Sequence, residues 1–168
     1  MPGNDTAFAL VGEFQFHFAN MEGALNSCVA KVLGIGGTTA AVVTGTLDFA
    51  KKVALVLAAI DANFSRDNHE TARKLLNKVR GENDPHRQNI IHSRFLATGH
   101  SEVTFFRTTA RDKLEQKIFT WTPDDFHQHF SRMASLANEL AALEEQLEPY
   151  VPSLDFSDPR NSGFVAML

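Results

Sequence analysis

The sequence contains very little cysteine, tyrosine and tryptophan, and it lacks any long hydrophobic run. Cys28 is the single cysteine among 168 residues, which excludes an internal disulfide and a metal cluster held by several thiols. The longest uncharged apolar stretch, VALVLAAI at 53–60, is much shorter than the roughly 20 residues of a membrane span. The first residues, MPGNDTAF, lack the basic and apolar regions of a secretory signal. We therefore expect a cytoplasmic protein without a membrane segment.

The composition that remains is that of a globular protein. Hydrophobic residues make up 43% of the chain and charged residues 21%, and the length suits one domain. Fourteen phenylalanines stand against one tryptophan and one tyrosine, so most of the aromatic mass is apolar. We expect a single domain at 1–148 with a core rich in phenylalanine, followed by an irregular tail at 149–168.

Charge is distributed unevenly along the chain. The segment from Arg66 to Arg94 holds seven basic and four acidic residues, which gives +3 and leaves −7 for the rest of a chain whose net charge is −4. A basic segment of this kind is compatible with phosphate binding, and it is equally the pattern of a solvated helix face. Charge alone does not decide between the two.

Apolar residues recur at helical spacing in several segments. The first such stripe, from Val11 to Val32, predicts a long helix that ends at Gly34. The GIGG at 34–37 lacks the preceding strand and the following Lys-Ser/Thr of a phosphate-binding loop, so it is interpreted as a connector. Further helices are predicted at 46–63, at 69–82 with a short apolar face, and at 123–147, where Thr122 and Pro123 supply the start.

A fourth helix is predicted between these, from Pro85 to about Ala97. Asp84 would be its N-cap and Gly99 its stop, with Ile91 and Phe95 on the inward face. Beyond it, EVTFFRT (102–108) and KIFTWT (117–122) alternate in the manner of a β-hairpin, although a short helix through RDKLEQKIF is a competing interpretation.

The predicted fold class is therefore all-α. We expect an antiparallel, up-down bundle of four to five helices, with a small β-hairpin inserted near 102–122. The first and last helices should pair along their lengths.

The stretch NDPHRQNIIH, at 83–92, carries the most suggestive polar pattern. An arginine followed by four to six residues and a histidine, on a late helix of a helical bundle, resembles the HEPN superfamily of bacterial and phage-defence proteins, many of them RNases. The fold resemblance covers roughly residues 5–148, and the motif about a dozen residues. The chain departs from the pattern at Gln88, because the family prefers Asn, Asp or His directly after the arginine.

The resemblance implies a metal-independent endoribonuclease, or an RNA-binding protein, of a bacterial defence or toxin–antitoxin system. His92 would move protons and Arg87 would hold the phosphate, with no cofactor and no metal. Substrate contacts would come from further polar and basic residues, namely Gln88, Asn89, Arg94 and Arg80. Residues five apart on a helix lie about 140° apart, so we expect a homodimer that joins His92 of one chain to Arg87 of the other.

Other interpretations stay open. The spacing of Arg and His also fits Arg80 with His86 and Arg94 with His100, while Arg87 could simply pair with Glu82 or Asp84. The alternative function is a non-catalytic helical module that binds a partner protein, such as an antitoxin, or a nucleotide phosphate. A structural part of a larger assembly is a third reading.

The remaining histidines have plainer interpretations. His127 and His129 are two apart on the last helix, point in different directions, and are interpreted as surface residues. His17, between two phenylalanines on the first helix, is interpreted as a residue at the edge of the core.

Overall fold

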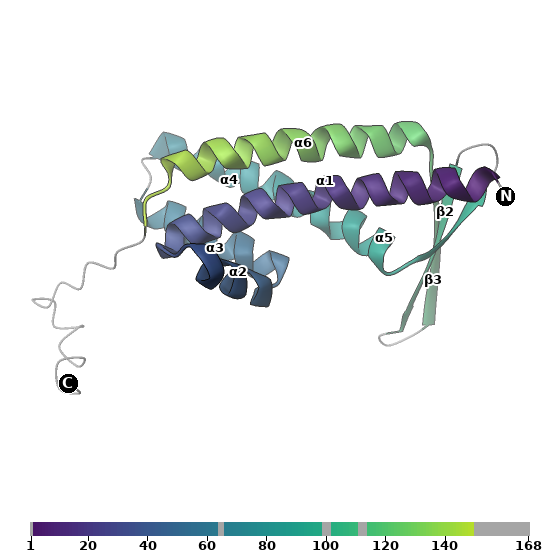
Figure 1. Ribbon diagram of the computed structural model, residues 1–168, viewed down its shortest axis with the longest axis horizontal. Coiled ribbons are helices and arrows are strands. Elements are labelled where there is room, and N and C mark those ends of the chain that lie inside the picture. The colour runs from purple at the N-terminus through teal and green to yellow at the C-terminus, as the bar shows by residue number, and fades with distance from the viewer. Residues whose placement is uncertain (1, 64–65, 99–101, 111–113, 150–168) are drawn as a thin grey trace, which may run out of the picture.

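The computed structural model describes residues 2–63, 66–98, 102–110 and 114–149 of the chain. It is mostly helical, with a small antiparallel sheet at one end of the helical body (Figure 1). In chain order the elements are α1 (Pro2–Leu33), α2 (Gly37–Thr46), α3 (Phe49–Asn63), α4 (Arg66–Gly81), the π-helical segment η1 (Glu82–Arg87), α5 (Gln88–Ile91), β1 (Arg94–Thr98), β2 (Glu102–Ala110), β3 (Leu114–Trp121) and α6 (Pro123–Gln146). The predicted tail lies, from Tyr150 on, outside the described residues.

The core is rich in phenylalanine, as the composition predicted. Phe14 and Phe18 of α1, Phe105 of β2 and Phe126 of α6 are among the largest side chains that are fully buried. Burying an aromatic side chain of this size contributes roughly 2–3 kcal/mol through the apolar surface removed from water. The core therefore joins the two long helices to the sheet.

The predicted pairing of the first and last helices is confirmed, since α1 and α6 lie side by side along their lengths (Figure 1). The relative direction of α1 and α6, however, is not the antiparallel one that was predicted. His17 stacks on Phe130, and farther along Cys28 donates to the carbonyl of Leu140, so the two helices run parallel. The short helix α2 leads the chain back toward the middle of α1, so that α3 begins where Phe49 packs on Phe18. From there α3 runs in the same direction as α1. The predicted antiparallel arrangement therefore fails for α3 and α6, both of which run parallel to α1.

Local sequence signals set two helix boundaries where they were predicted. The helix α1 ends at Gly34, whose φ of 63° is the left-handed conformation that glycine adopts without strain. At the start of α6, the Thr122 hydroxyl accepts from the backbone N–H of Asp125 at 3.2 Å, and the Asp125 carboxylate accepts from the N–H of Thr122 at 2.8 Å. This reciprocal capping box satisfies two free amide groups of the first turn.

The helix predicted at 46–63 corresponds to α3, which begins at Phe49, and the separate helix α2 before it was not predicted. The chain is helical over α2, extended at Leu47 (ψ 132°), and helical again from Phe49. The sequence of α2, GTTAAVVTGT, is poor in strong helix formers, and only Thr44 of this helix is buried. For this reason its periodicity was not recognisable.

The helix predicted from Pro85 to Ala97 is wrong. The chain is π-helical up to Arg87, completes one α-helical turn in α5 and enters β1 at Arg94. Ser93 caps the turn, since its hydroxyl donates to the carbonyl of Asn89 and its N–H to Ile90. As a result, Ile91, which was predicted to face the core, is exposed, and its neighbour Ile90 is buried instead.

The hairpin predicted near 102–122 is confirmed, and β1 adds a third strand that was not predicted. The strands pair antiparallel in the order β1-β2-β3. Phe95, Phe105 and Phe119 lie opposite one another and face the core, where Phe105 and Phe119 stack at 4.9 Å. The pairing of Phe95 with Phe105 explains why the chain leaves the helix after Ile91. The competing helix is wrong over its described residues, since 114–119 belong to β3, and the rest of that prediction, 111–113, lies outside the described residues.

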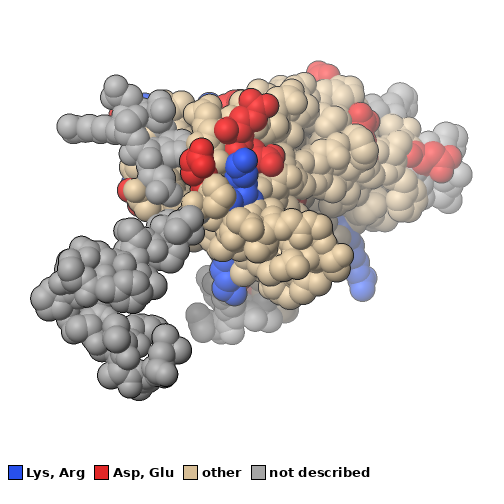
Figure 2. Space-filling view, turned by 60° about the vertical axis from the view of Figure 1, so that its left-hand side comes forward, with Lys and Arg blue, Asp and Glu red and all other residues tan. Residues whose placement is uncertain are grey.

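Most of the surface shown in Figure 2 is uncharged. The charged residues that appear on it are mainly a small group of Asp and Glu, with few Lys or Arg. The helix α2 carries no charged residue at all. In the described part of the chain, no single helix combines the length and apolar composition that crossing a membrane requires. Only the pair of Asp5–Leu33 and α2, bent by 114°, meets both criteria together.

Candidate functional site

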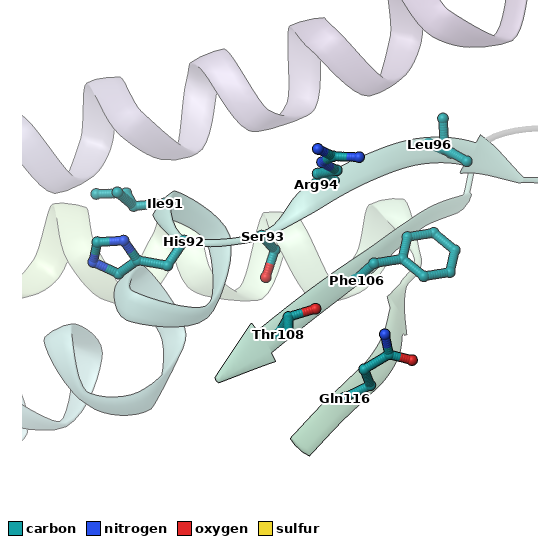
Figure 3. Close-up of a pocket in the computed structure, with 8 residues that line it drawn as sticks. All are labelled: Ile91, His92, Ser93, Arg94, Leu96, Phe106, Thr108 and Gln116. Carbon is teal, nitrogen blue, oxygen red and sulfur yellow. The ribbon is translucent and has the colours of Figure 1, made fainter. Parts of the chain in front are cut away.

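An open cavity of about 950 Å³ lies where α5 meets the sheet. Two of the residues singled out by the sequence, His92 and Arg94, line it from the turn after α5 and from the start of β1 (Figure 3). The other lining residues come from this turn and from all three strands: Ile91, Ser93, Leu96, Phe106, Thr108 and Gln116. Among the residues that the structure describes, none that lines the cavity is acidic, so no described carboxylate pairs with the arginine there.

Local structure explains why both basic side chains face this cavity. His92 is the C-cap of α5, where its backbone N–H donates to the Gln88 carbonyl at 3.2 Å and leaves its exposed imidazole free. Arg94 lies opposite Phe106 in the sheet, and Phe106 lies opposite Ile118, so these three side chains share the outward face. The turn and the first strand together thus bring the two residues to one opening.

The chemistry available in this cavity is that of proton transfer beside a fixed cation. Histidine is the side chain whose charge normally changes near neutral pH, and arginine is always charged and binds phosphate oxygens in pairs. Thr108 and Gln116 add a hydroxyl and an amide that can hydrogen bond to a ligand. An anionic ligand with an exchangeable proton would find complementary groups here.

Arg87 does not line the cavity. Its guanidinium lies over the Phe18 ring of α1, 4.6 Å from the ring centre, and its buried Nε has no hydrogen-bond partner. The structure therefore does not bring Arg87 and His92 together within one chain. The predicted 140° separation also loses its basis, because the segment that joins the two residues is not a regular α-helix.

The other residues predicted to contact the substrate lie outside the cavity. Asn89 accepts a hydrogen bond from the guanidinium of Arg107 on β2, which ties α5 to the sheet. Gln88 is half-buried and Arg80 is exposed on α4, and neither lines the cavity. Of the predicted site, only His92 and Arg94 share it.

A second cluster of polar residues was missed by the sequence analysis. Glu82 accepts a hydrogen bond from the His129 Nδ1–H at 2.8 Å and forms an ion pair with Arg132, whose Nε lies 3.0 Å from the carboxylate. His129 is buried rather than at the surface, and its ring stacks on Trp121 at 4.5 Å. The ring of His86 lies 4.3 Å from that of His129. This Glu82 cluster joins η1 to α6.

Two groups of the Glu82 cluster have shifted pKa values. Burial alone would raise the pKa of Glu82, but the hydrogen bond from His129 and the nearby positive charges outweigh it and hold the pKa below its usual value. Burial lowers the pKa of His86, and the charges of His129 and Arg132 lower it further against the opposing effect of Glu82. His86 therefore keeps its neutral form to lower pH than an ordinary histidine does.

The position of His129 could have been found in the sequence. Phe126, His129, Phe130 and Met133 follow the spacing of three, four and seven that defines one helix face, and all four are buried. His127 lies off this face and is exposed, as predicted. The predicted position of His17 at the edge of the core agrees with its stacking on Phe130 at 5.1 Å.

Thiol and metal chemistry find little support in the described ranges. Cys28 is buried and donates to the Leu140 carbonyl, and burial raises the pKa of its thiol to about 12, so it is not a reactive thiolate. Among the residues that the structure describes, no three His, Cys, Asp or Glu side chains converge as metal ligands.

The protein is mainly helical with a small antiparallel sheet, and the cavity of His92 and Arg94 lies where the helices meet the sheet. No protein-family model, curated protein or solved structure matches the chain. The resemblance to the HEPN superfamily stays a prediction from the sequence motif at 83–92.

Proposed function

We propose that this protein is an HEPN-like RNA-binding protein that cleaves RNA without a metal ion, in a bacterial defence or toxin–antitoxin system. The observation that carries the proposal is the shared cavity of His92 and Arg94, whose described lining residues include no acidic side chain. His92 is the proton-transfer group. Arg94, rather than Arg87, is the cation that contacts the phosphate, because Arg87 packs on Phe18 in the same chain.

The reaction needs no protein nucleophile. The ribose 2′-hydroxyl attacks the adjacent phosphorus while neutral His92 takes its proton. The bond from phosphorus to the 5′-oxygen breaks, and protonated His92 returns the proton to that leaving oxygen. The products are a 2′,3′-cyclic phosphate and a 5′-hydroxyl end. Arg94 stabilises the negative charge that builds up on the phosphoryl oxygens.

A homodimer with α5 at its interface is part of the proposal. Ile91 precedes His92 and is exposed, which provides an apolar contact that a second copy would cover. Sedimentation velocity with Ile91→Glu tests this contact: we expect the variant to be monomeric and the unmodified chain dimeric. A monomeric unmodified chain would remove the dimer from the proposal without affecting the cavity.

The decisive experiment measures cleavage of labelled RNA in the presence of a chelator. We expect His92→Ala to slow cleavage by about 10²- to 10⁴-fold, the usual contribution of a positioned acid–base group. His127→Ala is the matched control, since His127 is an exposed histidine outside this cavity. Both variants should unfold within about 0.5 kcal/mol of the unmodified protein.

The substrate provides a second control. RNA with a 2′-deoxy sugar at the cleaved position should bind but remain intact, because the internal nucleophile is missing. Wild-type protein that leaves all RNA intact, or cleavage that persists at full rate in His92→Ala, would contradict the nuclease proposal.

One observation favours the second candidate, a non-catalytic module that binds a partner protein or a nucleotide phosphate. The arginine of the motif is engaged with Phe18 and lies outside the cavity, as it would in a protein that kept the fold without the chemistry. Tight binding of RNA, nucleotide or an antitoxin protein without any cleavage would support this candidate.

A further inference from the structure

The outward face of the sheet carries three large apolar side chains in exposed positions. Leu96 of β1 is 58% exposed, Phe106 of β2 is 37% exposed and Ile118 of β3 is 66% exposed. Phe106 and Ile118 lie directly opposite each other, and Leu96 is two residues along β1 from the residue that faces Phe106. Each of the three strands thus contributes one member to this apolar sheet face.

Such a face is unusual for a small antiparallel sheet. The outward side normally alternates polar residues with the apolar residues of the inward side. Here the inward side is already filled by the stack of Phe105 on Phe119, so the outward apolar residues do not contribute to the core. A contiguous exposed apolar surface of this kind typically marks a binding site.

The apolar sheet face is continuous with the candidate site. Phe106 and Leu96 line the same cavity as His92 and Arg94, and Figure 3 shows the four side chains around one opening. A ligand that fills this opening must be anionic beside Arg94 and flat or apolar beside Phe106. The combination matches a nucleotide unit, in which a phosphate and an aromatic base lie a few ångströms apart.

This geometry favours single-stranded over double-stranded nucleic acid. In a duplex the faces of the bases are covered by their neighbours, whereas unpaired bases can stack on an aromatic side chain. The central position of Phe106 on the sheet makes it accessible to such a base, with Leu96 and Ile118 on either side.

We propose that the apolar sheet face is a base-stacking platform and that the protein consequently selects single-stranded RNA, with Phe106 stacking an unpaired base next to the phosphate held by Arg94. This inference rests on the proposed function and adds the strand state of the substrate and a specificity-determining residue. Phe106 acts on binding, whereas His92 acts on cleavage.

The test measures binding of a fluorescein-labelled RNA of about 12 nucleotides by anisotropy, using the 2′-deoxy form that is not cleaved. We expect tighter binding to the single strand than to the same sequence in a duplex. Phe106→Ala should weaken single-strand binding by roughly tenfold or more, the usual effect of losing one aromatic stacking partner. Phe106→Trp should restore it, and Phe106→Leu, which remains apolar, should not.

Phe16→Ala is the matched control. Phe16 is an exposed phenylalanine on α1, outside the cavity, and its removal should leave RNA binding unchanged. Thermal unfolding of each variant establishes that the fold is kept, and Phe106→Leu retains a side chain of similar bulk if the alanine variant is unstable.

The outcomes separate this inference from the function on which it rests. If Phe106→Ala and Phe106→Leu bind RNA like the unmodified chain while Arg94→Ala does not, the platform is wrong and the RNA-binding function stands. If the unmodified chain binds neither strand form, both fail. If Phe106→Ala turns a dimer into a monomer and leaves the single-strand affinity per subunit unchanged, the face is an interface between copies and the platform is overturned.

Discussion

The Glu82 cluster and the cavity of His92 and Arg94 are built from the same kinds of residue and differ in what surrounds them. In the Glu82 cluster, the side chains of His129 and Glu82 are buried and bonded to each other, and Arg132 bonds to the same carboxylate. In the cavity, His92 and Arg94 are exposed, and the described part of the chain places no carboxylate in the lining. A saturated cluster stabilises the fold, whereas an open pair of the same residues is available to a ligand.

The comparison shows that residue type alone does not identify a site. The carboxylate decides the outcome, because Glu82 supplies within the chain the negative charge that a bound phosphate would supply at Arg94. It follows that mutations in the Glu82 cluster should act on stability and mutations in the cavity on function. The predictions below test this separation, from the largest effect to the smallest.

Glu82→Gln should cause the largest loss of stability. The substitution keeps the shape of the side chain but removes the charge that satisfies His129 and Arg132, and hydrogen bonds to a buried charge are worth about 2–3 kcal/mol. Urea denaturation should show a loss of this size. Glu139→Gln is the control, because Glu139 is exposed on α6 and accepts a hydrogen bond from the neighbouring hydroxyl of Ser135. Equal stability of the two variants would show that the Glu82 cluster does not stabilise the fold.

Arg87→Ala should have an intermediate effect on stability. It removes a guanidinium that covers the Phe18 ring, a contact worth about 1–2 kcal/mol when partly shielded from water. Arg94→Ala provides the comparison, since its side chain is exposed and its loss should change the unfolding free energy by less than about 0.5 kcal/mol. In the RNA assay the order should reverse, with Arg94→Ala the more damaging. The opposite order in both assays would return Arg87 to the site.

The smallest effect concerns pH. The pKa of His86 in the folded protein lies below its ordinary value near 6.5, so the unfolded chain binds more protons than the folded one in this range. Its contribution to stability is complete above pH 6.5 and is lost as the pH falls toward the lowered pKa. The pKa of Glu82 is also lowered, but from a value near 4.5, so its contribution is lost only in more acidic solution.

Unfolding free energies measured between pH 7.5 and 5 should therefore fall with acidification, and His86→Gln should fall less steeply. His127→Gln is the matched control and should follow the unmodified profile, because His127 is exposed. A His86→Gln profile identical to the unmodified one would show that His86 is not held neutral by its surroundings.

Much of the helical framework was predictable because its signals are local. The stripe of α1, the glycine that ends it, the Leu75, Leu76 and Val79 face of α4 and the capping residues of α6 each depend on neighbours within one or two turns. The β-hairpin was predictable for the same reason, since its two strands are close in sequence. Of the candidate site, His92 and Arg94 were named, but their common cavity was not.

The failures involve contacts between distant parts of the chain. The strand β1 forms because Phe95 finds Phe105 and the core, which local helix signals after Pro85 do not reveal. His129 can be buried because Glu82, 47 residues away, accepts a hydrogen bond from its ring. The parallel direction of α1 and α6 depends on the short return in α2, which has too little helix propensity to be recognised.

By itself, the sequence determined that this protein has a phenylalanine-rich helical core, a hairpin between its last two helical regions and a cluster of basic and histidine residues near position 90. Only the tertiary structure decided which of these residues are used in packing and which are free. Arg87 faces the ring of Phe18, whereas Arg94 faces an open cavity. The reason is physical: helix periodicity and capping are short-range, but burial and charge pairing depend on which distant side chains the fold brings into contact.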